Sequence, residues 1–310
     1  FVFSFSILPF ILIFNFRSKY IIFGLLSIPI TILLFSSFVR LYNKDNKVSD
    51  KNLITLVQPN IEQKDKWNLE KRNANLNKLT QFSIQNVNEY IGVNRIIIWP
   101  ETSFEGTIPN EMELLSVISK RILTDQKAIL VVGLLRVDKN KLFNSLVFLN
   151  SKGNIIHHYD KIHLVPFGEY IPLRNKFTTI ANFLSLKDFS SGNIKPNFTL
   201  KGFGNILTLI CYEILFTEEV ISRLSKNTNL LINITNDAWF GKTIGPYQHL
   251  ALAKIKAVEL GIPLARVANT GISALISPYG EEITKIPLYE SGVRTAKLTL
   301  PLKHTIYRKY

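Results

Sequence analysis

Cysteine is almost absent from this sequence, which has one residue of that type, Cys211. A single cysteine excludes an internal disulfide and any CxxC metal site. The thiol is then either a buried core residue or a reactive group. Composition alone favours the core residue.

Acidic residues are also few. Asp and Glu total 23 against 37 Lys and Arg, which gives a formal net charge of +14. This excess indicates an anionic partner, either nucleic acid or a membrane that contains acidic lipids. The sequence has no zinc-finger, RNP or helix-turn-helix signature, and Gly202-Phe203-Gly204 is too short for a phosphate-binding loop. We therefore expect no nucleic-acid partner and favour a membrane.

Charged residues are nearly missing from the first forty positions. The uncharged run 21–39 is long enough to cross roughly 30 Å of hydrocarbon and predicts a transmembrane helix. Residues 1–16 look like the remainder of another. Arg17 and Lys19 lie between the two runs, so the positive-inside rule places that link in the cytoplasm and the rest of the chain outside. A cleaved signal peptide is the alternative, but no A-x-A-like site follows the run.

Three parts are predicted along the chain. Residues 1–42 form transmembrane segments, residues 43–51 a polar linker, and residues 52–310 a catalytic domain. Because Phe1 is not Met and lies inside an apolar run, we expect the sequence to be a piece of a longer membrane protein.

From residue 52 onward, short β-branched runs alternate with amphipathic stretches, which is typical of a layered α/β domain. The predicted strands are 54–57, 95–99, 128–134, 145–149, 206–210, 230–234, 264–268, 273–276 and 294–298. The predicted helices are 67–90, 112–125, 218–224 and 248–260.

Three of these strands end in residues that can do chemistry. Glu101 follows the strand 95–99, Cys211 follows 206–210, and Asp237 follows 230–234. The carboxyl ends of neighbouring parallel strands converge in α/β folds. Lys161 lies in a polar and aromatic loop, 159–170, of the irregular kind that often carries function.

A thiol needs a base or a nearby cation to become a good nucleophile. Glu101 can be the base and Lys161 the cation, and the same ammonium can stabilise a tetrahedral oxyanion. Taken singly, each residue has an ordinary interpretation: a solvated strand end, a surface lysine and a core thiol.

The joint pattern resembles the nitrilase superfamily and, within it, the apolipoprotein N-acyltransferase family. The segments that carry the resemblance are WPET at 99–102, YDKIHLVPFGEY at 159–170, CYE at 211–213, VQPN at 57–60, KW at 66–67, NDAWF at 236–240, GPYQH at 245–249 and ANTGIS at 268–273. Lys256 and Ile262 stand where the family would have arginines, which concerns local packing or headgroup contacts and not the nucleophile. The family's upstream helices and final helix are missing here, so truncation at both ends is expected.

The resemblance implies an α-β-β-α sandwich that follows transmembrane helices, in the bacterial inner membrane with the catalytic domain on the periplasmic side. Its catalytic residues would be Glu101, Lys161 and Cys211. An acyl chain would pass from a phospholipid to a Cys211 thioester, and then to the α-amine of a lipoprotein's N-terminal diacylglyceryl cysteine. Glu101 would be the base in both halves, and no organic cofactor or metal is implied.

Other residues near the predicted triad are assigned supporting or binding roles. Glu169 would orient Lys161. Glu213 resembles another residue that the family needs, and strand alternation would point it to the same side as Cys211 if the strand continued. We expect four aromatic residues to line an acyl-chain cleft rather than the core: Trp67, Tyr212, Trp239 and Phe240. The histidines 157, 158, 163 and 249 lack metal-ligand spacing.

Two other functions stay open. A membrane-tethered amidase of the same superfamily would use water as the acceptor, and the triad alone does not separate it from an acyltransferase. A catalytically dead scaffold would use the sandwich only to bind partners, but it would have no need to retain Glu101, Lys161 and Cys211 together.

Overall fold

The computed structural model describes residues 16–42, 44, 47–85, 87–172, 188–193, 197–303 and 305–309. The chain divides into two compact units, Phe1–Asp45 and Asn46–Tyr310. The described helix of the first unit is α2 (Phe16–Tyr42), which contains the predicted run 21–39, whereas residues 1–15 of the other predicted span lie outside the described part. In the portion of the chain that is described, no helix combines the length and apolarity that crossing a membrane requires. The membrane spans therefore stay a prediction.

Two sheets make up the body of the second unit, within the residues that the structure describes. The first runs in the order β13 (Gly292–Thr299), β1 (Val48–Gln58), β2 (Asn94–Ile98), β4 (Ala128–Asp138), β5 (Lys141–Leu149) and β6 (Ile155–Asp160), with β3 (Thr107–Ile108) paired to β4. The second runs β12 (Glu282–Ile286), β11 (Ser273–Ile276), β10 (Leu264–Ala268), β9 (Thr228–Thr235), β8 (Gly204–Ile210) and β7 (Asn197–Leu200).

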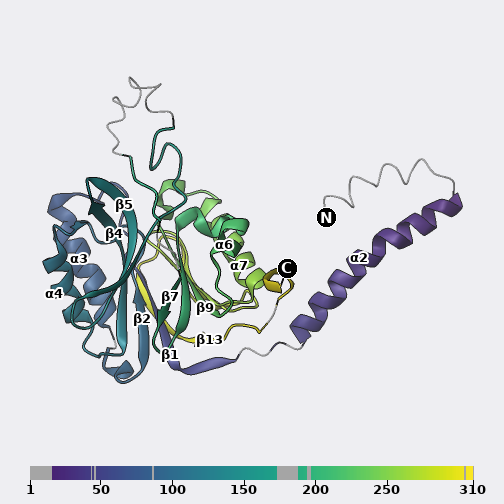
Figure 1. Cartoon of the computed structure of the whole chain (residues 1–310), viewed down its shortest axis with the longest axis horizontal. Coiled ribbons are helices and arrows are strands. Elements are labelled where there is room, and N and C mark those ends of the chain that lie inside the picture. The colour runs from purple at the N-terminus through teal and green to yellow at the C-terminus, as the bar shows by residue number, and fades with distance from the viewer. Residues whose placement is uncertain are drawn as a thin grey trace. The chain divides into compact units, whose positions relative to one another are not determined.

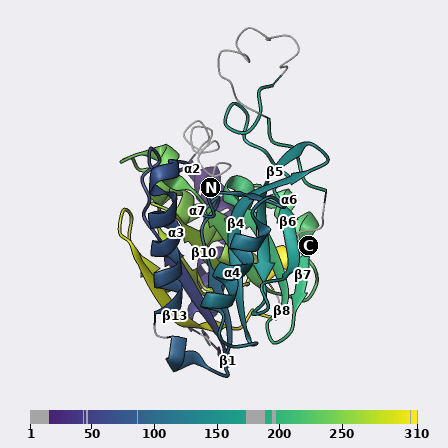
Figure 2. The same cartoon turned by 90° about the vertical axis from the view of Figure 1, so that its left-hand side faces the viewer.

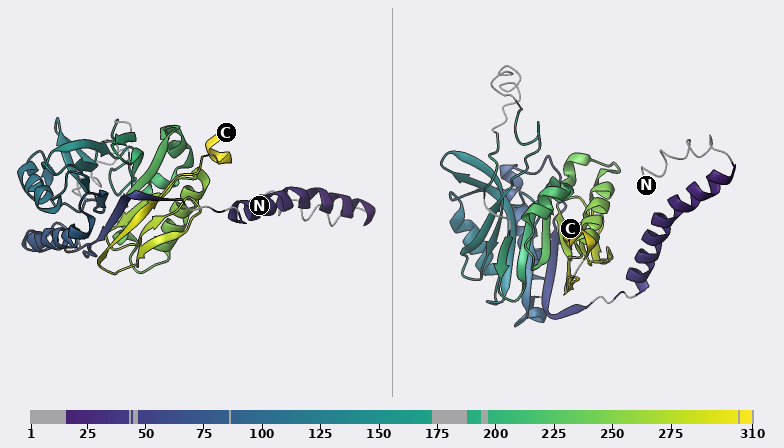
Figure 3. Two further views of the ribbon diagram at one scale, coloured as in Figure 1. Left: turned by 90° about the horizontal axis from the view of Figure 1, so that it is seen from below. Right: turned by 45° about the vertical axis from the view of Figure 1, so that its right-hand side comes forward.

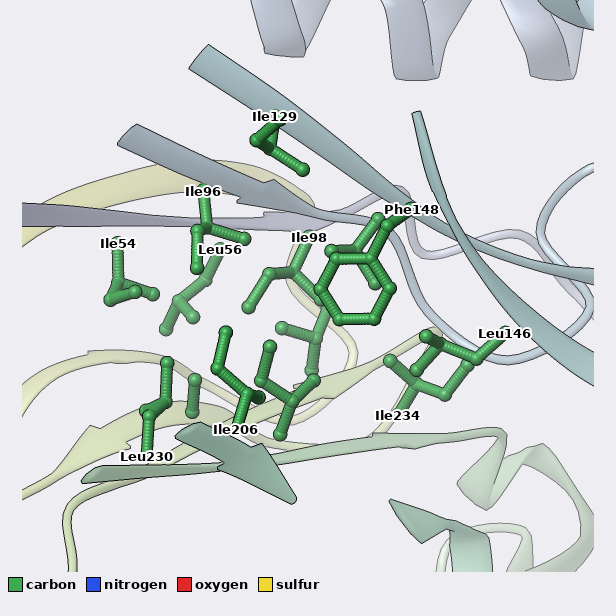
Figure 4. Close-up of a cluster of buried hydrophobic side chains, with 14 of the residues drawn as sticks. Ile54, Leu56, Ile96, Ile98, Ile129, Leu146, Phe148, Ile206, Leu230 and Ile234 are labelled. Atoms are coloured by element: carbon green, nitrogen blue, oxygen red, sulfur yellow. The ribbon is translucent and has the colours of Figure 1, made fainter. Parts of the chain in front are cut away.

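The central strands are buried on both faces, and their side chains alternate between two apolar layers. Ile96 and Ile98 of β2 pack between the sheets, whereas Ile97 packs on the outer side. In the second sheet, Ile206 points inward and Leu207 outward. Figure 4 shows the inner layer, where side chains of the two sheets meet.

Helices cover the two outer faces. Leu76 and Leu79 of α3 (Leu69–Ile84) and Leu115 of α4 (Met112–Ile122) pack on the first sheet. Val220 of α6 (Thr217–Arg223) and Ala253 of α7 (Gly245–Leu260) pack on the second. Figure 1 shows the four layers side by side, and Figure 2 looks onto α3 and α4 in front of their sheet. The predicted helix–sheet–sheet–helix sandwich of the nitrilase kind is confirmed, and its layers are also visible in Figure 3.

The strand directions bring several strand ends to one edge. β1, β2 and β4 are parallel, as are β8, β9 and β10. β5 is antiparallel to both β4 and β6, so β6 runs in the same direction as β4. The carboxyl ends of β2, β6, β8 and β9 are the positions that Glu101, Lys161, Cys211 and Asn236 follow.

Helix boundaries differ from the prediction, most clearly in α3, in α4 and in α7, which begins at Gly245 and not at the predicted Gln248. The predicted helix 67–90 is wrong as one element: α3 begins after the N-cap Asn68 and ends at Ile84, and a separate 3-10 turn, η1 (Val87–Tyr90), follows. Trp67 has φ 68°, which a right-handed helix does not allow, and Gln85 is extended. α4 ends at Ile122, before the predicted Asp125.

The strands that were not predicted are mostly edge strands. β6, β7 and β12 each end a sheet, and β3 has two residues. An edge strand faces water and carries polar side chains, so its apolar period is weak. β1 begins at Val48, inside the stretch predicted as a linker, because Val48 pairs with Thr299 and Leu300 N donates to Lys47 O.

Candidate active site

Glu101 is held on a tight turn just after β2. The backbone at Thr102 has φ 45°, and Ser103 N donates to Gly133 O of β4 at 2.8 Å. A Cβ at Gly133 would overlap Pro100 O and Glu101 Cα, so only glycine allows β4 to approach this closely. The close packing of the turn against β4 therefore fixes its backbone conformation.

Three groups surround the Glu101 carboxylate. Asn144 Nδ2 of β5 donates to Oε1 at 2.7 Å, and the main-chain N–H of Asn236 donates to Oε2 at 2.8 Å. Lys161 Nζ lies 3.9 Å from Oε1. Both carboxylate oxygens thus have fixed partners, which orient the Glu101 side chain within the cleft.

Lys161 follows the last residue of β6 and is only 1 % exposed. Its main-chain N–H donates to Asn144 O at 2.8 Å, and its ammonium lies 3.0 and 2.9 Å from the two oxygens of Glu169. Burial by itself would lower the pKa of Lys161, but Glu101, Cys211 and Glu169 raise it above the ordinary value. Lys161 is therefore a permanent cation in this site.

Glu169 lies where the sequence predicted it, against the lysine. Its other contacts are Asn144 Nδ2, which donates to Oε1 at 2.9 Å, and Val165 N, which donates to Oε2 at 2.8 Å. Asn144 Nδ2 thus bridges Glu169 and Glu101, so the loop acid and the strand-end acid share one amide.

Cys211 begins a 3-10 turn, η2 (Cys211–Leu215), directly after β8. Its φ of 56° is unusual for a residue with a side chain and marks a sharp elbow. Burial, reinforced by the charge of Glu101, raises the pKa of Cys211 to about 12, against the opposing effect of Lys161. The resting group is a thiol, and its attack requires a base.

Glu213 lies away from the cleft. The strand stops at Ile210, so the alternation that would have pointed Glu213 to the side of Cys211 does not apply. Oε1 accepts from Tyr159 OH at 2.7 Å and from Ile162 N at 2.9 Å, and Oε2 accepts from Ile210 N at 2.8 Å. Arg223 Nη1 lies 3.2 Å from Oε1. This carboxylate ties the lysine loop to the elbow of the nucleophile.

A second buried network lies close to Cys211. The sequence analysis noted Asp237 of this network for its place at a strand end and His249 only for its lack of metal-ligand spacing. Asp237 accepts from Arg266 Nη2 at 2.8 Å and from Thr235 Oγ1 at 3.0 Å, and His249 Nδ1 lies 3.0 Å from its Oδ1. Although burial would raise it, the pKa of Asp237 is lowered to about 2 by Arg266 and His249. Burial and Arg266 lower the pKa of His249.

A cleft of about 420 Å³ opens over these groups. Glu101, Lys161, Glu169 and Cys211 line it. The four predicted aromatic residues also line it: Trp67, Tyr212, Trp239 and Phe240. Trp239 is 75 % exposed and Trp67 is 45 % exposed, so the aromatic wall rises from the buried centre to the surface.

Asn144 and Lys66 are among the residues of the cleft that were not predicted as site residues. Asn144 interrupts an apolar strand between Phe143 and Leu146, and a buried amide in such a run is the signal that could have identified it. Lys66 lines the cleft beside Trp67 and is buried. The KW pair at 66–67 carried part of the family resemblance, but nothing in it assigned a role in the site to the lysine.

Among the described residues, no three His, Cys, Asp or Glu side chains come together as a metal site would require. The absence of a metal or an organic cofactor stays a prediction.

The model of the carbon-nitrogen hydrolase family matches residues 53–305. An apolipoprotein N-acyltransferase of Rhizobium etli (strain CIAT 652) is 39% identical over 250 residues, which are 77% of this chain and 46% of that protein. One of Vibrio cholerae is 33% identical over 258 residues, 79% of this chain and 49% of that protein. The chain spans about half the length of the curated relatives it matches.

Solved structures support the fold. Saccharomyces cerevisiae Nit3, a member of branch 10 of the nitrilase superfamily, has a TM-score of 0.60 at 19% identity and covers 81% of this chain and 91% of its own. An amidase from Nesterenkonia sp. has a TM-score of 0.57 at 19% identity and covers 81% and 92%. The resemblance drawn from the motifs is confirmed: this chain is similar to apolipoprotein N-acyltransferases and belongs to the carbon-nitrogen hydrolase family.

Proposed function

We propose that this chain is the catalytic part of an apolipoprotein N-acyltransferase. The observation that carries the proposal is the meeting of Glu101, Lys161 and Cys211, from three distant strand ends, in one cleft with aromatic walls. The relatives named apolipoprotein N-acyltransferase support the same reaction.

In the first half-reaction, Cys211 Sγ attacks the sn-1 ester carbonyl of a phospholipid while Glu101 accepts the thiol proton. The negative charge that develops on the carbonyl oxygen faces the ammonium of Lys161. The ester C–O bond then breaks, the leaving alkoxide takes the proton from Glu101, and a lysophospholipid departs. The acyl chain remains on Cys211 as a thioester.

In the second half-reaction, the α-amine of an N-terminal diacylglyceryl cysteine attacks the thioester. Glu101 accepts a proton from the amine, and the C–S bond breaks. The thiolate then recovers a proton from Glu101, so the free enzyme is restored and the product is an amide. Only the carboxylate can accept protons in both halves, because an ammonium is a donor only.

The surroundings of the cleft support an apolar substrate. Trp67, Tyr212, Trp239 and Phe240 supply apolar surface at its wall and mouth. We assign them contact with acyl chains, since aromatic rings bury large apolar areas. We also keep the proposal that residues 1–42 are membrane-embedded and that the catalytic domain lies on the periplasmic side, on the basis of Arg17 and Lys19.

The test is to incubate the purified protein with phospholipid and to measure its intact mass before and after hydroxylamine, which cleaves thioesters. We expect a hydroxylamine-labile acyl adduct on the wild type and none on Cys211→Ser. Since Cys211 is the only thiol in the chain, the adduct has one place to form.

The acceptor is tested next, by adding a diacylglyceryl lipopeptide to the acylated protein. N-acylated peptide supports the acyltransferase. Loss of the adduct to free fatty acid, with no acylated peptide, would instead support the amidase-like alternative in which water is the acceptor.

A further inference from the structure

Lys66 is a buried cation that the proposed mechanism does not use. It lies in the loop between β1 and α3, is 6 % exposed, and lines the cleft. Its ammonium donates to the main-chain oxygen of Glu101 at 3.1 Å and to Thr102 Oγ1 at 2.6 Å. Two hydrogen bonds from Lys66 thus hold the turn that carries Glu101.

The electrostatic setting of Lys66 is uncommon for a structural lysine. Among the described residues, no carboxylate oxygen lies within 4.0 Å of its Nζ. Burial lowers the pKa of Lys66 to about 8, against the opposing effects of Glu101, Glu105 and Cys211. Burying an ammonium without a direct counter-ion costs stability, so an apolar side chain would suit the fold better. A charge retained at this cost, in a cleft, indicates a role in function.

The neighbourhood of Lys66 links two parts of the site. The next residue, Trp67, has φ 68°, and Asn75 Nδ2 of α3 donates at 3.4 Å to the main-chain oxygen of Asp65 in the same loop. Asn75 Nδ2 of α3 donates to Glu105 Oε1 at 2.7 Å. The loop with Trp67 and the turn with Glu101 are therefore joined directly by Lys66 and indirectly through Asn75 and Glu105.

We propose that Lys66 is a positioning residue whose positive charge, fixed on the Glu101 turn, makes the Cys211 thiolate easier to form. Lys161 and Lys66 then place two cations in the cleft that Cys211 also lines, and they come from different loops. This inference rests on the proposed nucleophilic role of Cys211, but its test needs no lipid.

The test is the rate at which iodoacetamide alkylates Cys211 at pH 7, where a lysine with a pKa of about 8 is mostly charged, in the full chain, followed by intact mass. The chain has one cysteine, so the mass shift reports this thiol alone. Lys66→Gln keeps a hydrogen-bond donor and removes the charge. We expect alkylation about tenfold slower, as for a rise of about one unit in the pKa of the thiol. Lys66→Met should be slowed at least as much, and Lys66→Arg should stay closer to the wild type.

Lys64→Met is the matched control, because Lys64 lies two residues away, is largely exposed and pairs with Glu62 at 2.7 Å. Its alkylation rate should not change. Thermal melting of each variant separates a local effect from unfolding, and Lys66→Gln carries the test if Lys66→Met does not fold. A folded Lys66→Gln that alkylates at the wild-type rate would overturn the inference.

The steady-state kinetics of acyl transfer provide a second test of the role of Lys66. Lys66→Gln should lower kcat with little change in KM, since Lys66 is proposed to act on the nucleophile and not on substrate binding. A wild type that forms no acyl adduct would reject the proposed function, yet the alkylation rates would still decide the role of Lys66.

Discussion

The floor of the cleft, formed by Glu101, Asn144, Lys161 and Cys211, differs from its rim, formed by Trp67 and Trp239, in how firmly the fold holds each side chain. Every floor residue lies in a strand or directly beyond a strand end, is buried, and is fixed by contacts that cross between elements. Of the rim residues, Trp67 lies in a loop and Trp239 in a short 3-10 helix, η3 (Asp237–Phe240), and both are exposed. The floor is preorganised by the two sheets, whereas the rim can adapt to a long substrate.

This difference separates chemistry from binding. A change in the floor should affect kcat and, where a buried charge loses its partner, stability. A change in the rim should affect KM alone. Four substitutions or conditions test this division, from the largest expected effect to the smallest.

Glu101→Gln should have the largest effect. The amide keeps the size of the side chain but cannot accept a proton, so acyl-adduct formation should fall by about 10² to 10⁴-fold, as for loss of a general base. Quenched-flow mass spectrometry of the thioester measures this rate. Adduct formation at the normal rate would mean that another group is the base, with Glu169, which lines the cleft, first to be tested.

Glu213→Gln should act through stability. It removes one of the two carboxylates that Arg223 contacts, Glu219 being the other, and weakens the hydrogen bonds that link the lysine loop to the elbow, at a cost of about 3 kcal/mol. Differential scanning calorimetry should show Tm lowered by roughly 6–12 °C. Glu169→Gln is the matched comparison, because the Glu169 carboxylate lines the cleft. This substitution should lower kcat more, and Tm less, than Glu213→Gln does. Equal effects of the two changes on kcat and Tm would contradict the different roles of the two carboxylates.

Acid should weaken the buried network behind the floor. The pKa of Asp237 is about 2 in the folded protein, against an ordinary value of 3.8 for this side chain. A carboxyl group whose pKa is lower in the folded than in the unfolded protein stabilises the fold at pH values above its unfolded-state pKa. This contribution, about 2 kcal/mol in total, is lost as the pH falls through the folded-state pKa. Urea unfolding at pH 5 and pH 3 should show about half of this loss in the wild type and less in Asp237→Asn. The same slope in both proteins would exclude Asp237 as its source.

Trp239→Ala should have the smallest effect. The ring is mostly exposed, so Tm should hardly change. Loss of its apolar contact with an acyl chain should raise KM several-fold, about 1 kcal/mol, while kcat is kept. Initial rates over a range of phospholipid concentrations in mixed micelles provide the measurement. A fall in kcat at unchanged KM would mean that Trp239 takes part in the chemical step, as the floor residues do, and would contradict the proposed separation of chemistry from binding.

Much of the fold was determined by the sequence itself. β10 and β11 were predicted to the residue, and the buried cores of β2, β4, β8 and β9 were predicted within a few residues. These strands are apolar on both faces, which leaves few other places for them in a layered domain. The edge strands β6, β7 and β12 were not predicted, because their polar side chains show no clear hydrophobic period.

The candidate site divides in the same way. The sequence by itself determined which residues can do the chemistry, since a thiol, a carboxylate and an ammonium at strand ends and in one loop are local features. Only the tertiary structure decided how they are held: that Asn144 joins Glu101 to Glu169, that Glu213 braces the loop from outside the cleft, and that Lys66 reaches the Glu101 turn. Each of these contacts joins residues that lie far apart along the chain, and their geometry depends on where separate strands end in space. No local pattern contains that information, because it arises only when the two sheets pack.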